Sequence, residues 1–427
     1  MKLLVALLGV CSAVLAREGF GPTDQEWGYV TVRDGAHMFW WLHYTTATPD
    51  PTEKPLLIWL QGGPGASSTQ YGNFEEIGPI DSDLNERNTS WVKYANVLFV
   101  DNPVGTGFSY VNSNEFATTN QQIAQDFVEL LQGFYQALPQ FENVPLYIFC
   151  ESYGGKMTAE IGLNLYQAIE RGEIRSNFKG VGLGDSWISP VDSCLTWAPY
   201  LYNQGFLDTQ QYNLLNQQAL QLKTLVDEGK WFEATDAWGD LESSVANYAN
   251  DVDFYNVLTK ISGNFLKNTL YKPDGEKVGD EEFLMNKQVK QALGLEQDWG
   301  RQSDDVFYYL QTDFMKPVTD IVERLLNETD LTVAVYNGQL DLIVDTPGTI
   351  DWVDKLNFRE SITWSSTTKR PFDISGINEG FEKSAGNLAF FWVLRAGHMV
   401  PRDNPNGMLY ILQQVTDNFK VDAHAIN

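Results

Sequence analysis

The sequence predicts an α/β fold with a mostly parallel central sheet. Two observations carry this prediction: short apolar runs that are typical of strands buried on both faces, and segments between them with helical spacing of apolar residues. The clearest unit begins with the run NVLFVD at 96–101, continues with a helical pattern over 120–138 and returns to the run LYIFC at 146–150. This β-α-β order favours parallel strands that are covered by helices.

The alternation continues along the chain. We expect further strands at 27–33, 37–44, 56–60, 179–184, 331–337 and 389–394, and further helices from Gly154 to about 171 and over 209–228 and 406–419. Between about 189 and 300 the strand rhythm stops, and amphipathic patterns rich in Gln, Asn and Asp indicate an inserted helical cap. Because no internal repeat or low-complexity linker interrupts the chain, residues 17–427 are expected to form a single domain that carries this cap.

The first sixteen residues have the pattern of a secretory signal peptide, in which Lys2 precedes an apolar run that ends in small residues at Ala13 and Ala16. An uncleaved signal anchor is the alternative. No later stretch approaches the roughly 20 apolar residues that span a bilayer, so we expect no further membrane span. Two sequons, at Asn88 and Asn327, are consistent with glycosylation on the same route. These features indicate the secretory pathway and a secreted, lysosomal or vacuolar location.

The formal net charge of −27 argues against nucleic acid and anionic membranes as partners, because both require basic patches. An acidic chain is compatible with an acidic lumen. Of the three cysteines, Cys11 would leave with the signal peptide, so Cys150 and Cys194 remain. A single pair does not make a disulfide scaffold, and the sequence leaves open whether the two are bonded.

A candidate nucleophile follows the predicted strand at 146–150. Residues 150–154 read Cys-Glu-Ser-Tyr-Gly, close to the G-x-S-x-G nucleophile elbow, in which a serine occupies a strained strand-to-helix turn. The residues two before and two after the serine must be small, so that strand and helix can approach, and Cys150 is small enough. The alternative for Ser152 is a serine in an ordinary loop.

A serine hydroxyl needs a base to take its proton, and His398 is the candidate. It follows the predicted strand at 389–394. Asp341, which comes directly after the strand at 331–337, is the candidate acid that orients it. The chain order Ser152, Asp341, His398 is the one expected of the α/β-hydrolase fold.

Other residues fit these roles less well. Asp345 and Asp351 compete with Asp341 but lie further from the strand end. His37 and His43 lie in early strands and His424 lies near the C-terminus, where core or solvated roles are expected. No H-E-x-x-H pattern, paired Cys-x-x-Cys or histidine cluster occurs, so we expect no metal site.

Backbone N–H groups must stabilise the oxyanion that forms when a serine attacks a carbonyl group. One is expected from Tyr153, the residue after the nucleophile. A second is expected from the glycine-rich loop QGGPG at 61–65, which directly follows the apolar run at 56–60. A plain turn is the alternative for this loop.

Taken together, five segments resemble the signatures of the serine carboxypeptidases: WLQGGPGASS at 59–68, DNPVGTGFSY at 101–110, ESYGG at 151–155, NGQLDLIV at 337–344 and AGHMVP at 396–401. They are spread in order over nearly the whole mature chain. The resemblance implies an α/β-hydrolase fold and a serine-type carboxypeptidase, which releases C-terminal amino acids from peptides with a free C-terminus through an acyl-enzyme. It implies no cofactor and leaves a homodimer open.

The resemblance also implies a set of binding residues. The oxyanion donors would be the N–H groups of Gly63 and Tyr153, and the terminal carboxylate of the substrate would be held by a network of Trp59, Gln61, Glu76 and Glu151. A carboxylate is repelled by two carboxyl groups unless these hold protons and donate them. Binding is therefore expected to be strongest below neutral pH.

Three residues depart from the family pattern. Gln61 replaces the usual Asn and is one methylene longer, Ala66 replaces a cysteine, and Cys150 replaces the elbow glycine. None of them belongs to the predicted triad, although Gln61 changes the fit of the terminal carboxylate. Two other functions remain as alternatives: an esterase or acyltransferase that uses the same triad, and a non-catalytic secreted binding or protective protein.

Overall fold

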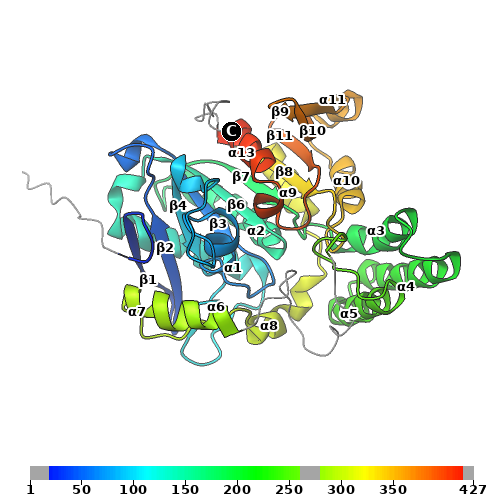
Figure 1. Ribbon diagram of the computed structural model, residues 1–427, viewed down its shortest axis with the longest axis horizontal. Coiled ribbons are helices and arrows are strands. Elements are labelled where there is room, and N and C mark those ends of the chain that lie inside the picture. The colour runs from blue at the N-terminus through cyan, green and yellow to red at the C-terminus, as the bar shows by residue number, and fades with distance from the viewer. Residues whose placement is uncertain (1–18, 260–278, 417–427) are drawn as a thin grey trace, which may run out of the picture.

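The computed structural model describes residues 19–259 and 279–416, so the predicted signal peptide at 1–16 lies outside the described residues. Its centre is an 11-stranded sheet (Figure 1) in the order β1-β2-β4-β3-β6-β7-β8-β11-β10-β9, with β5 paired to β2. The strands are β1 (Gln25–Arg33), β2 (Ala36–His43), β3 (Leu56–Leu60), β4 (Asn96–Val100), β5 (Tyr110–Val111), β6 (Pro145–Glu151), β7 (Asn177–Gly184), β8 (Thr332–Gly338), β9 (Arg370–Ile374), β10 (Ile377–Ala385) and β11 (Leu388–Val393).

The centre of the sheet is parallel and its two edges are antiparallel. Neighbouring strands run parallel from β4 through β3, β6, β7 and β8 to β11, which confirms the predicted parallel core. The pairs at the edges, β1 with β2, β2 with β4, β11 with β10 and β10 with β9, are antiparallel. The sequence prediction lacks β9 and β10, because the segment at 370–385 is polar and has no continuous apolar run.

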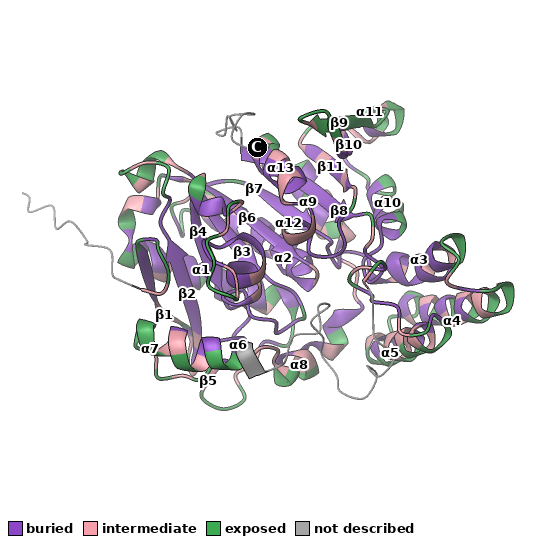
Figure 2. Ribbon diagram, viewed as in Figure 1, coloured by how far each residue is buried: buried purple, intermediate pink, exposed green. Residues whose placement is uncertain are grey.

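Alternate residues of the central strands enter two cores, one on each face of the sheet. In β3, Leu56, Ile58 and Leu60 belong to the core shared with α1 and α2, whereas Leu57 and Trp59 belong to the core shared with α13. Burial on both faces explains why these strands appear in the sequence as unbroken apolar runs. Figure 2 shows the central strands buried, with exposed residues on the helices, on the loops and on the edge strand β9.

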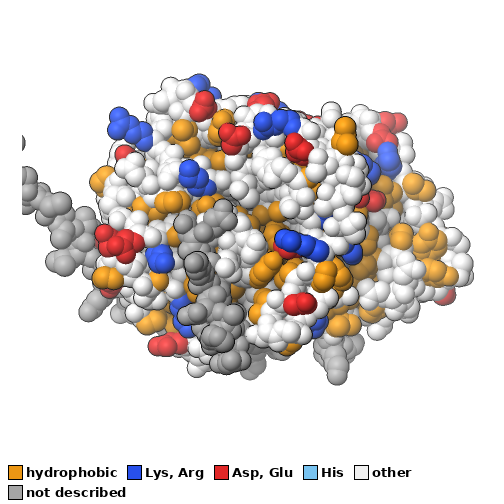
Figure 3. All heavy atoms as spheres, turned by 90° about the horizontal axis from the view of Figure 1, so that it is seen from above, with side chains coloured by type: hydrophobic (Ala, Val, Ile, Leu, Met, Phe, Trp, Pro, Cys, Tyr) orange, Lys and Arg blue, Asp and Glu red, His pale blue; other side chains and the backbone are white. Residues whose placement is uncertain are grey.

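The helices are α1 (Asn120–Ala137), α2 (Tyr153–Glu170), α3 (Pro190–Asn203), α4 (Thr209–Asp227), α5 (Trp231–Tyr248), α6 (Gly279–Phe283), α7 (Lys290–Leu293), α8 (Asp304–Phe314), α9 (Thr319–Glu328), α10 (Thr346–Asp354), α11 (Ser361–Ser366), α12 (Val400–Asp403) and α13 (Pro405–Thr416). Within the described ranges, none of them is long and apolar enough to cross a membrane. Lys and Arg side chains lie scattered among Asp and Glu on the face in Figure 3, where they form no basic patch.

Between β7 and β8 the regular elements of the described chain are helices, and they occupy separate places. Helices α3, α4 and α5 pack against one another to one side of the sheet, whereas α6 and α7 lie near β1 at the other side (Figure 1). Trp27 of β1 donates its indole N–H to the Leu293 carbonyl oxygen of α7 at 2.8 Å. Helices α8 and α9 follow before β8 begins, so this helical region continues past residue 300.

A buried ion pair ties α8 to the first turn of α2. The Lys156 ammonium lies 3.1 Å from the Asp313 carboxylate, with both side chains buried, and it also donates to the Asp313 carbonyl oxygen. Tyr153 donates its hydroxyl to the same carboxylate at 3.3 Å. Burial lowers the pKa of Lys156 to about 8 in spite of the Asp313 charge. The pair therefore fixes the start of α2 against the helical region.

We predict that Asp313→Ala destabilises the fold by about 3–5 kcal/mol, because it leaves the Lys156 charge buried and unpaired. Urea unfolding at pH 6 measures the change. The matched control is Lys223→Ala, which breaks the exposed pair with Asp227 and should cost at most about 0.5 kcal/mol. The cost of Asp313→Ala should be smaller at pH 9, where Lys156 can lose its proton. Equal costs for the two variants would contradict the role given to the buried pair.

Candidate active site

Ser152 occupies the turn between β6 and α2 with φ 62° and ψ −131°, a conformation that residues with side chains rarely adopt. Its N–H donates to the carbonyl oxygens of Gly184 and Asp185, both at 3.1 Å. The turn needs glycine nearby, because a Cβ on Gly154 would lie 2.5 Å from the Leu60 carbonyl oxygen. This geometry is that of a strained strand-to-helix elbow, with the serine at its apex.

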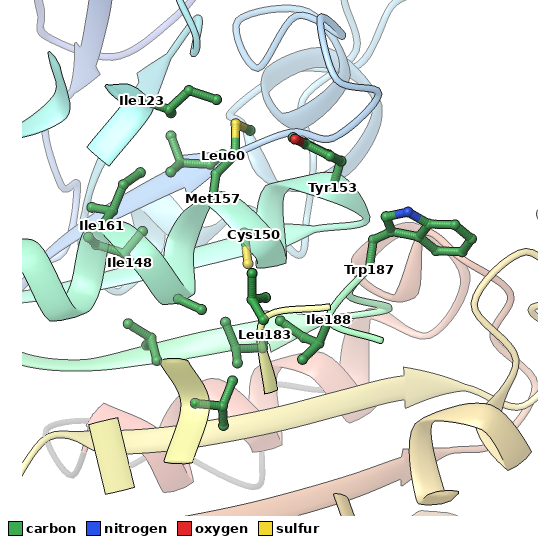
Figure 4. Packing of buried hydrophobic residues seen from close by; sticks show 14 of the residues in the cluster. Leu60, Ile123, Ile148, Cys150, Tyr153, Met157, Ile161, Leu183, Trp187 and Ile188 are labelled. Carbon is green, nitrogen blue, oxygen red and sulfur yellow. The ribbon is translucent and has the colours of Figure 1, made fainter. Parts of the chain in front are cut away.

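Cys150 and Cys194 are both buried and free, so the two cysteines do not form a disulfide. Cys150 stands where the elbow pattern has its first glycine, and its Sγ donates to the Gly182 carbonyl oxygen at 3.2 Å. Figure 4 shows its side chain beside Leu183 in the apolar core. Burial raises the pKa of the Cys150 thiol to about 12. The thiol therefore acts as a small core side chain and leaves the turn intact.

Asp341 and His398 meet at the end of the parallel sheet that also carries Ser152. Asp341 follows β8 and His398 follows β11, and these strands are parallel neighbours. His398 Nδ1 lies 2.8 Å from Asp341 Oδ2, with both side chains buried. Burial lowers the pKa of His398 to about 4. The imidazole is therefore neutral above that pH and can accept a proton.

The Nε2 atom of His398 is available to accept a proton. It is buried and makes no hydrogen bond to any described residue, and Ser152 lines the same pocket as His398. No hydrogen bond joins Ser152 Oγ to this nitrogen in the structure, as is common in active sites before substrate binds.

A segment that follows α5 holds the loops of Asp341 and His398 in place. The His398 N–H donates to the Tyr255 carbonyl oxygen at 2.7 Å, and the N–H groups of Leu342 and Ile343 donate to the Phe254 carbonyl oxygen, each at 2.9 Å. The Tyr255 ring meets the His398 ring edge-on at 5.1 Å. Sequence analysis misses this segment because its role depends on tertiary packing that no local pattern reports.

The glycine-rich loop after β3 lies against the nucleophile. A Cβ on Gly62 would lie 2.5 Å from Ser152 Cβ and 2.9 Å from the Tyr153 nitrogen, so only glycine allows this approach. Gly63 and Tyr153 both line the pocket. Neither of their N–H groups donates a hydrogen bond to a described residue, and Tyr153 opens the 18-residue helix α2, whose N-terminus favours negative charge.

The four residues predicted to hold a carboxylate form one connected network. Trp59 Nε1 donates to Gln61 Oε1 at 2.8 Å, and Gln61 Nε2 donates to Glu151 Oε1, also at 2.8 Å. Glu151 and Glu76 hydrogen-bond to each other through their carboxyl groups. Gln61 and Glu151 line the pocket, whereas Trp59 and Glu76 are buried and do not line it.

The two carboxyl groups of this network share protons. Both oxygens of Glu76 and Oε2 of Glu151 are buried and receive no N–H or hydroxyl donor from the described residues. Burial raises the pKa of Glu76 to about 8. Burial and the adjacent Glu76 also raise the pKa of Glu151 well above its usual range. The pair is therefore protonated in acid and can donate a hydrogen bond into the pocket.

The pocket contains charged residues that sequence analysis does not single out, among them Arg402 and Glu242. Arg402 donates to the Asp403 carboxylate at 3.2 Å and lies 3.8 Å from Glu75. Asp403 also accepts the Gly397 N–H at 2.8 Å, which links the arginine to the His398 loop. The feature of the sequence that could have identified Arg402 as a pocket residue is its position four residues after His398.

Glu242 lines the same pocket as four aromatic side chains, those of Tyr153, Trp187, Trp238 and Phe314. Trp238 and Phe314 meet with ring centroids 4.8 Å apart, and Trp187 and Phe314 at 5.3 Å. Glu242 makes no hydrogen bond or ion pair with a described residue, and burial raises its pKa to about 7.

The remaining candidates lie elsewhere or have other partners. Asp345 is buried and caps α10 by accepting the Gly348 N–H, and it also accepts the Thr196 hydroxyl at 2.6 Å, while Asp351 is exposed. His43 is buried against the Thr23 hydroxyl at 2.8 Å. His37 stacks on Tyr110 at the sheet edge, and His424 lies outside the described residues. Ala66, which stands where the family pattern has a cysteine and therefore cannot form a disulfide, lines the pocket.

The two sequons differ in their surroundings. The Asn88 side chain is exposed on a loop. Asn327 is also exposed but lies near the end of α9, where its amide donates to the Asn357 carbonyl oxygen at 3.0 Å and accepts the Arg359 N–H at 2.9 Å. Of the two side chains, Asn88 is therefore the less constrained.

Comparison with known proteins agrees with the sequence signatures. The model of the serine carboxypeptidase family matches residues 18–418. The retinoid-inducible serine carboxypeptidase of Rattus norvegicus is 46% identical over 97% of this chain and 96% of its own length, and that of Homo sapiens is 45% identical over the same shares. A prohormone-processing carboxypeptidase from Saccharomyces cerevisiae has the same fold, with a TM-score of 0.81 at 22% identity over 92% of this chain and 91% of that one. A serine elbow, a buried Asp-His pair and these relatives over almost the whole length lead to one conclusion: the chain belongs to the serine carboxypeptidase family.

Proposed function

We propose that this enzyme removes the C-terminal amino acid from peptides, with Ser152 as nucleophile, His398 as base and Asp341 as the acid that orients the base. The observation that carries the proposal is the Gln61–Glu151–Glu76 network beside the pocket that holds Ser152 and His398. Simple ester hydrolysis has no need of such a network, whereas a substrate with a free carboxylate does.

In the proposed reaction, Ser152 Oγ attacks the carbonyl carbon of the last peptide bond as His398 Nε2 takes its proton. Asp341 accepts a hydrogen bond from the Nδ1–H of His398 and stabilises the charged imidazole. The N–H groups of Gly63 and Tyr153 donate to the oxyanion. His398 then protonates the leaving amine, and the C-terminal amino acid departs from the acyl-enzyme. Water, deprotonated by His398, attacks the ester and restores Ser152.

The terminal carboxylate is proposed to accept hydrogen bonds from the Gln61 amide and from protonated Glu151. Glu76 supports Glu151 from within the core and holds the shared proton. Arg402 adds a positive charge to the pocket, which partly offsets the negative charge of Glu75 at 3.8 Å. A free carboxylate thus meets donors as long as the glutamate pair keeps a proton.

Glu242, the acid on α5, indicates which substrate side chains the enzyme would favour. Glu242 has no hydrogen-bond or ion-pair partner among the described residues and lines a pocket that also contains aromatic rings. This combination suits a Lys or Arg side chain, because aromatic faces and a carboxylate both attract a cation. We propose that the enzyme favours a basic residue next to the scissile bond. The helices at about 189–300, which include α5, then act as the cap that sets specificity.

The secretory route is also proposed, from the signal pattern at 1–16 and the exposed sequon at Asn88. An acidic compartment or the cell exterior would be compatible with a site whose glutamate pair works in its protonated form.

We predict that N-blocked dipeptides lose their C-terminal amino acid in the presence of the enzyme, and that Ser152→Ala abolishes the release, because no other nucleophile lies at the elbow. Amidation of the substrate's C-terminus should lower kcat/KM sharply by removing the carboxylate that the network binds. Amino acid release measured by chromatography checks both. Ser152-dependent ester cleavage with no preference for a free carboxylate would instead favour an esterase or acyltransferase. No turnover at any pH would favour a binding protein.

We predict a bell-shaped dependence of kcat/KM on pH for peptides with a free C-terminus. The rise should lie near pH 4, where His398 becomes neutral, and the fall near pH 8, where the glutamate pair loses its proton. The fall should appear as a rise in KM. Initial rates from pH 3.5 to 9 measure both limbs. The double variant Glu76→Gln/Glu151→Gln has no proton to lose, so an unchanged alkaline rise in its KM would contradict the assignment.

We predict that Glu242→Gln reduces the advantage of a Lys substrate over its uncharged norleucine counterpart about tenfold, the effect expected from losing one charged hydrogen bond. The loss should be larger at pH 8 than at pH 5, because burial raises the pKa of Glu242 to about 7 and the carboxylate is charged only above it. The ratio of the two kcat/KM values measures the preference. Glu233→Gln, on the exposed side of α5, is the control and should leave the ratio unchanged. A ratio that Glu242→Gln also leaves unchanged would remove this subsite.

A further inference from the structure

A third acid lies beside the Asp341–His398 pair. Asp185 comes directly after β7 and is fully buried. Its N–H donates to the Tyr336 carbonyl oxygen at 2.9 Å, and its own carbonyl oxygen accepts the Ser152 N–H at 3.1 Å. Side-chain atoms of Asp185, Asp341 and His398 lie within 4.8 Å of one another. The backbone of Asp185 is thus hydrogen-bonded to the nucleophile, and its side chain lies near the acid and the base.

The two carboxyl groups have different sets of donors. Asp341 Oδ2 faces His398 Nδ1 at 2.8 Å, and Asp341 Oδ1 accepts the Val344 N–H at 3.3 Å. Asp185 Oδ1 accepts the Gly338 N–H at 2.8 Å. Asp185 Oδ2, in contrast, is buried and receives no N–H or hydroxyl donor from the described residues. Donors therefore favour the charged form at Asp341 more than at Asp185.

Two adjacent buried carboxyl groups cannot both be ionised without a large electrostatic cost. A hydrogen bond between the two carboxyl groups requires that one of them carries a proton. The proton is assigned to Asp185, because its Oδ2 receives no hydrogen bond from any other donor among the described residues. We propose that Asp185 is a positioning residue that stays protonated and donates a hydrogen bond from its Oδ2 to the Asp341 carboxylate. This bond would fix the orientation of Asp341 against His398 and keep the negative charge on Asp341. The inference rests on the proposed roles of Asp341 and His398.

The surroundings support this distribution of charge. The groups that face Asp185 are Asp341, His398, Glu151 at the end of β6 and Tyr336 on β8. Burial raises the pKa of Asp185 well above its usual range, and the Asp341 charge raises it further. The hydrogen bond from Asp185 opposes the effect of burial on the pKa of Asp341. Asp185 therefore keeps its proton to a higher pH than an exposed carboxyl group does, and its ionisation would break the bond.

Asparagine is the informative substitution, because it matches the proposed state of Asp185 in shape and charge. In Asp185→Asn the amide oxygen can accept the Gly338 N–H while the NH2 group donates to Asp341. We expect Asp185→Asn to keep kcat within about threefold of the unchanged protein, and Asp185→Ala to lower it about 10- to 100-fold with little change in KM, as loss of a hydrogen bond to a charged group implies. Asp192→Asn, which changes a buried acid outside the pocket, serves as the control.

The pH profile separates positioning from a merely structural role. With an ester substrate, kcat of the unchanged protein should fall at alkaline pH as Asp185 ionises, and kcat of Asp185→Asn should not. If Asp185→Asn is as damaging as Asp185→Ala while both variants keep the unfolding midpoint of the unchanged protein, or if it keeps the alkaline fall in kcat, the proposal is wrong.

An infrared measurement tests whether Asp185 is protonated and needs no enzymatic turnover. Its result is therefore valid even if the proposed function is wrong. At pH 7 the difference spectrum between the unchanged protein and Asp185→Asn should contain the C=O band of a protonated carboxyl group. This band should shift in D2O, and the difference spectrum with Asp192→Asn should lack it. A carboxylate band in its place would show that Asp185 is ionised and would overturn the proposal. Activity that survives Ser152→Ala would instead refute the proposed function and leave the infrared result to decide the protonation of Asp185.

Discussion

The site depends on the parallel alignment of four strands. Strands β6, β7, β8 and β11 end at the same edge of the sheet, and the residues that follow them are Ser152, Asp185, Asp341 and, after a short loop, His398. Hydrogen bonds continue past the strand ends, from Ser152 to Gly184 and Asp185 and from Asp185 to Tyr336. Residues nearly 250 positions apart therefore meet with the precision of a sheet register, which loops alone would not supply.

Burial favours the protonated form of several acids in this site, and this has a consequence for the whole molecule. It raises the pKa values of Glu76, Glu151 and Asp185. The folded chain then holds protons that the unfolded chain would release above about pH 4. The stability that this contributes is present in acid and is lost as pH rises through the raised pKa values.

Much of the sheet could be predicted because burial of the central strands leaves a local pattern of apolar residues in the sequence. The strand predicted at 56–60 coincides with β3 (Leu56–Leu60), since burial on both faces leaves an unbroken apolar run. The polar hairpin of β9 and β10 has no such signal, because its strands are stabilised at the edge by pairing. The elbow serine and the loop residues Asp341 and His398 could be selected from their places after strands. Asp185 occupies the same kind of position after the strand predicted at 179–184, but a lone acid in a loop gives no sign of a carboxyl partner from another strand.

Three of the residues that sequence reasoning missed share one cause, which is that their roles depend on the helical region. Tyr255 and Phe254 follow α5 and accept hydrogen bonds from the loops of His398 and Asp341, while Glu242 on α5 faces the pocket. The same helical region therefore does two things: it lines the pocket and it holds the loops of His398 and Asp341 in place. A change in the packing of α5 would alter specificity and catalysis together, because the chain that leaves this helix is hydrogen-bonded to both catalytic loops. In this molecule the sheet determines where the reacting groups lie, and the region next to it determines how firmly they are held and what they meet.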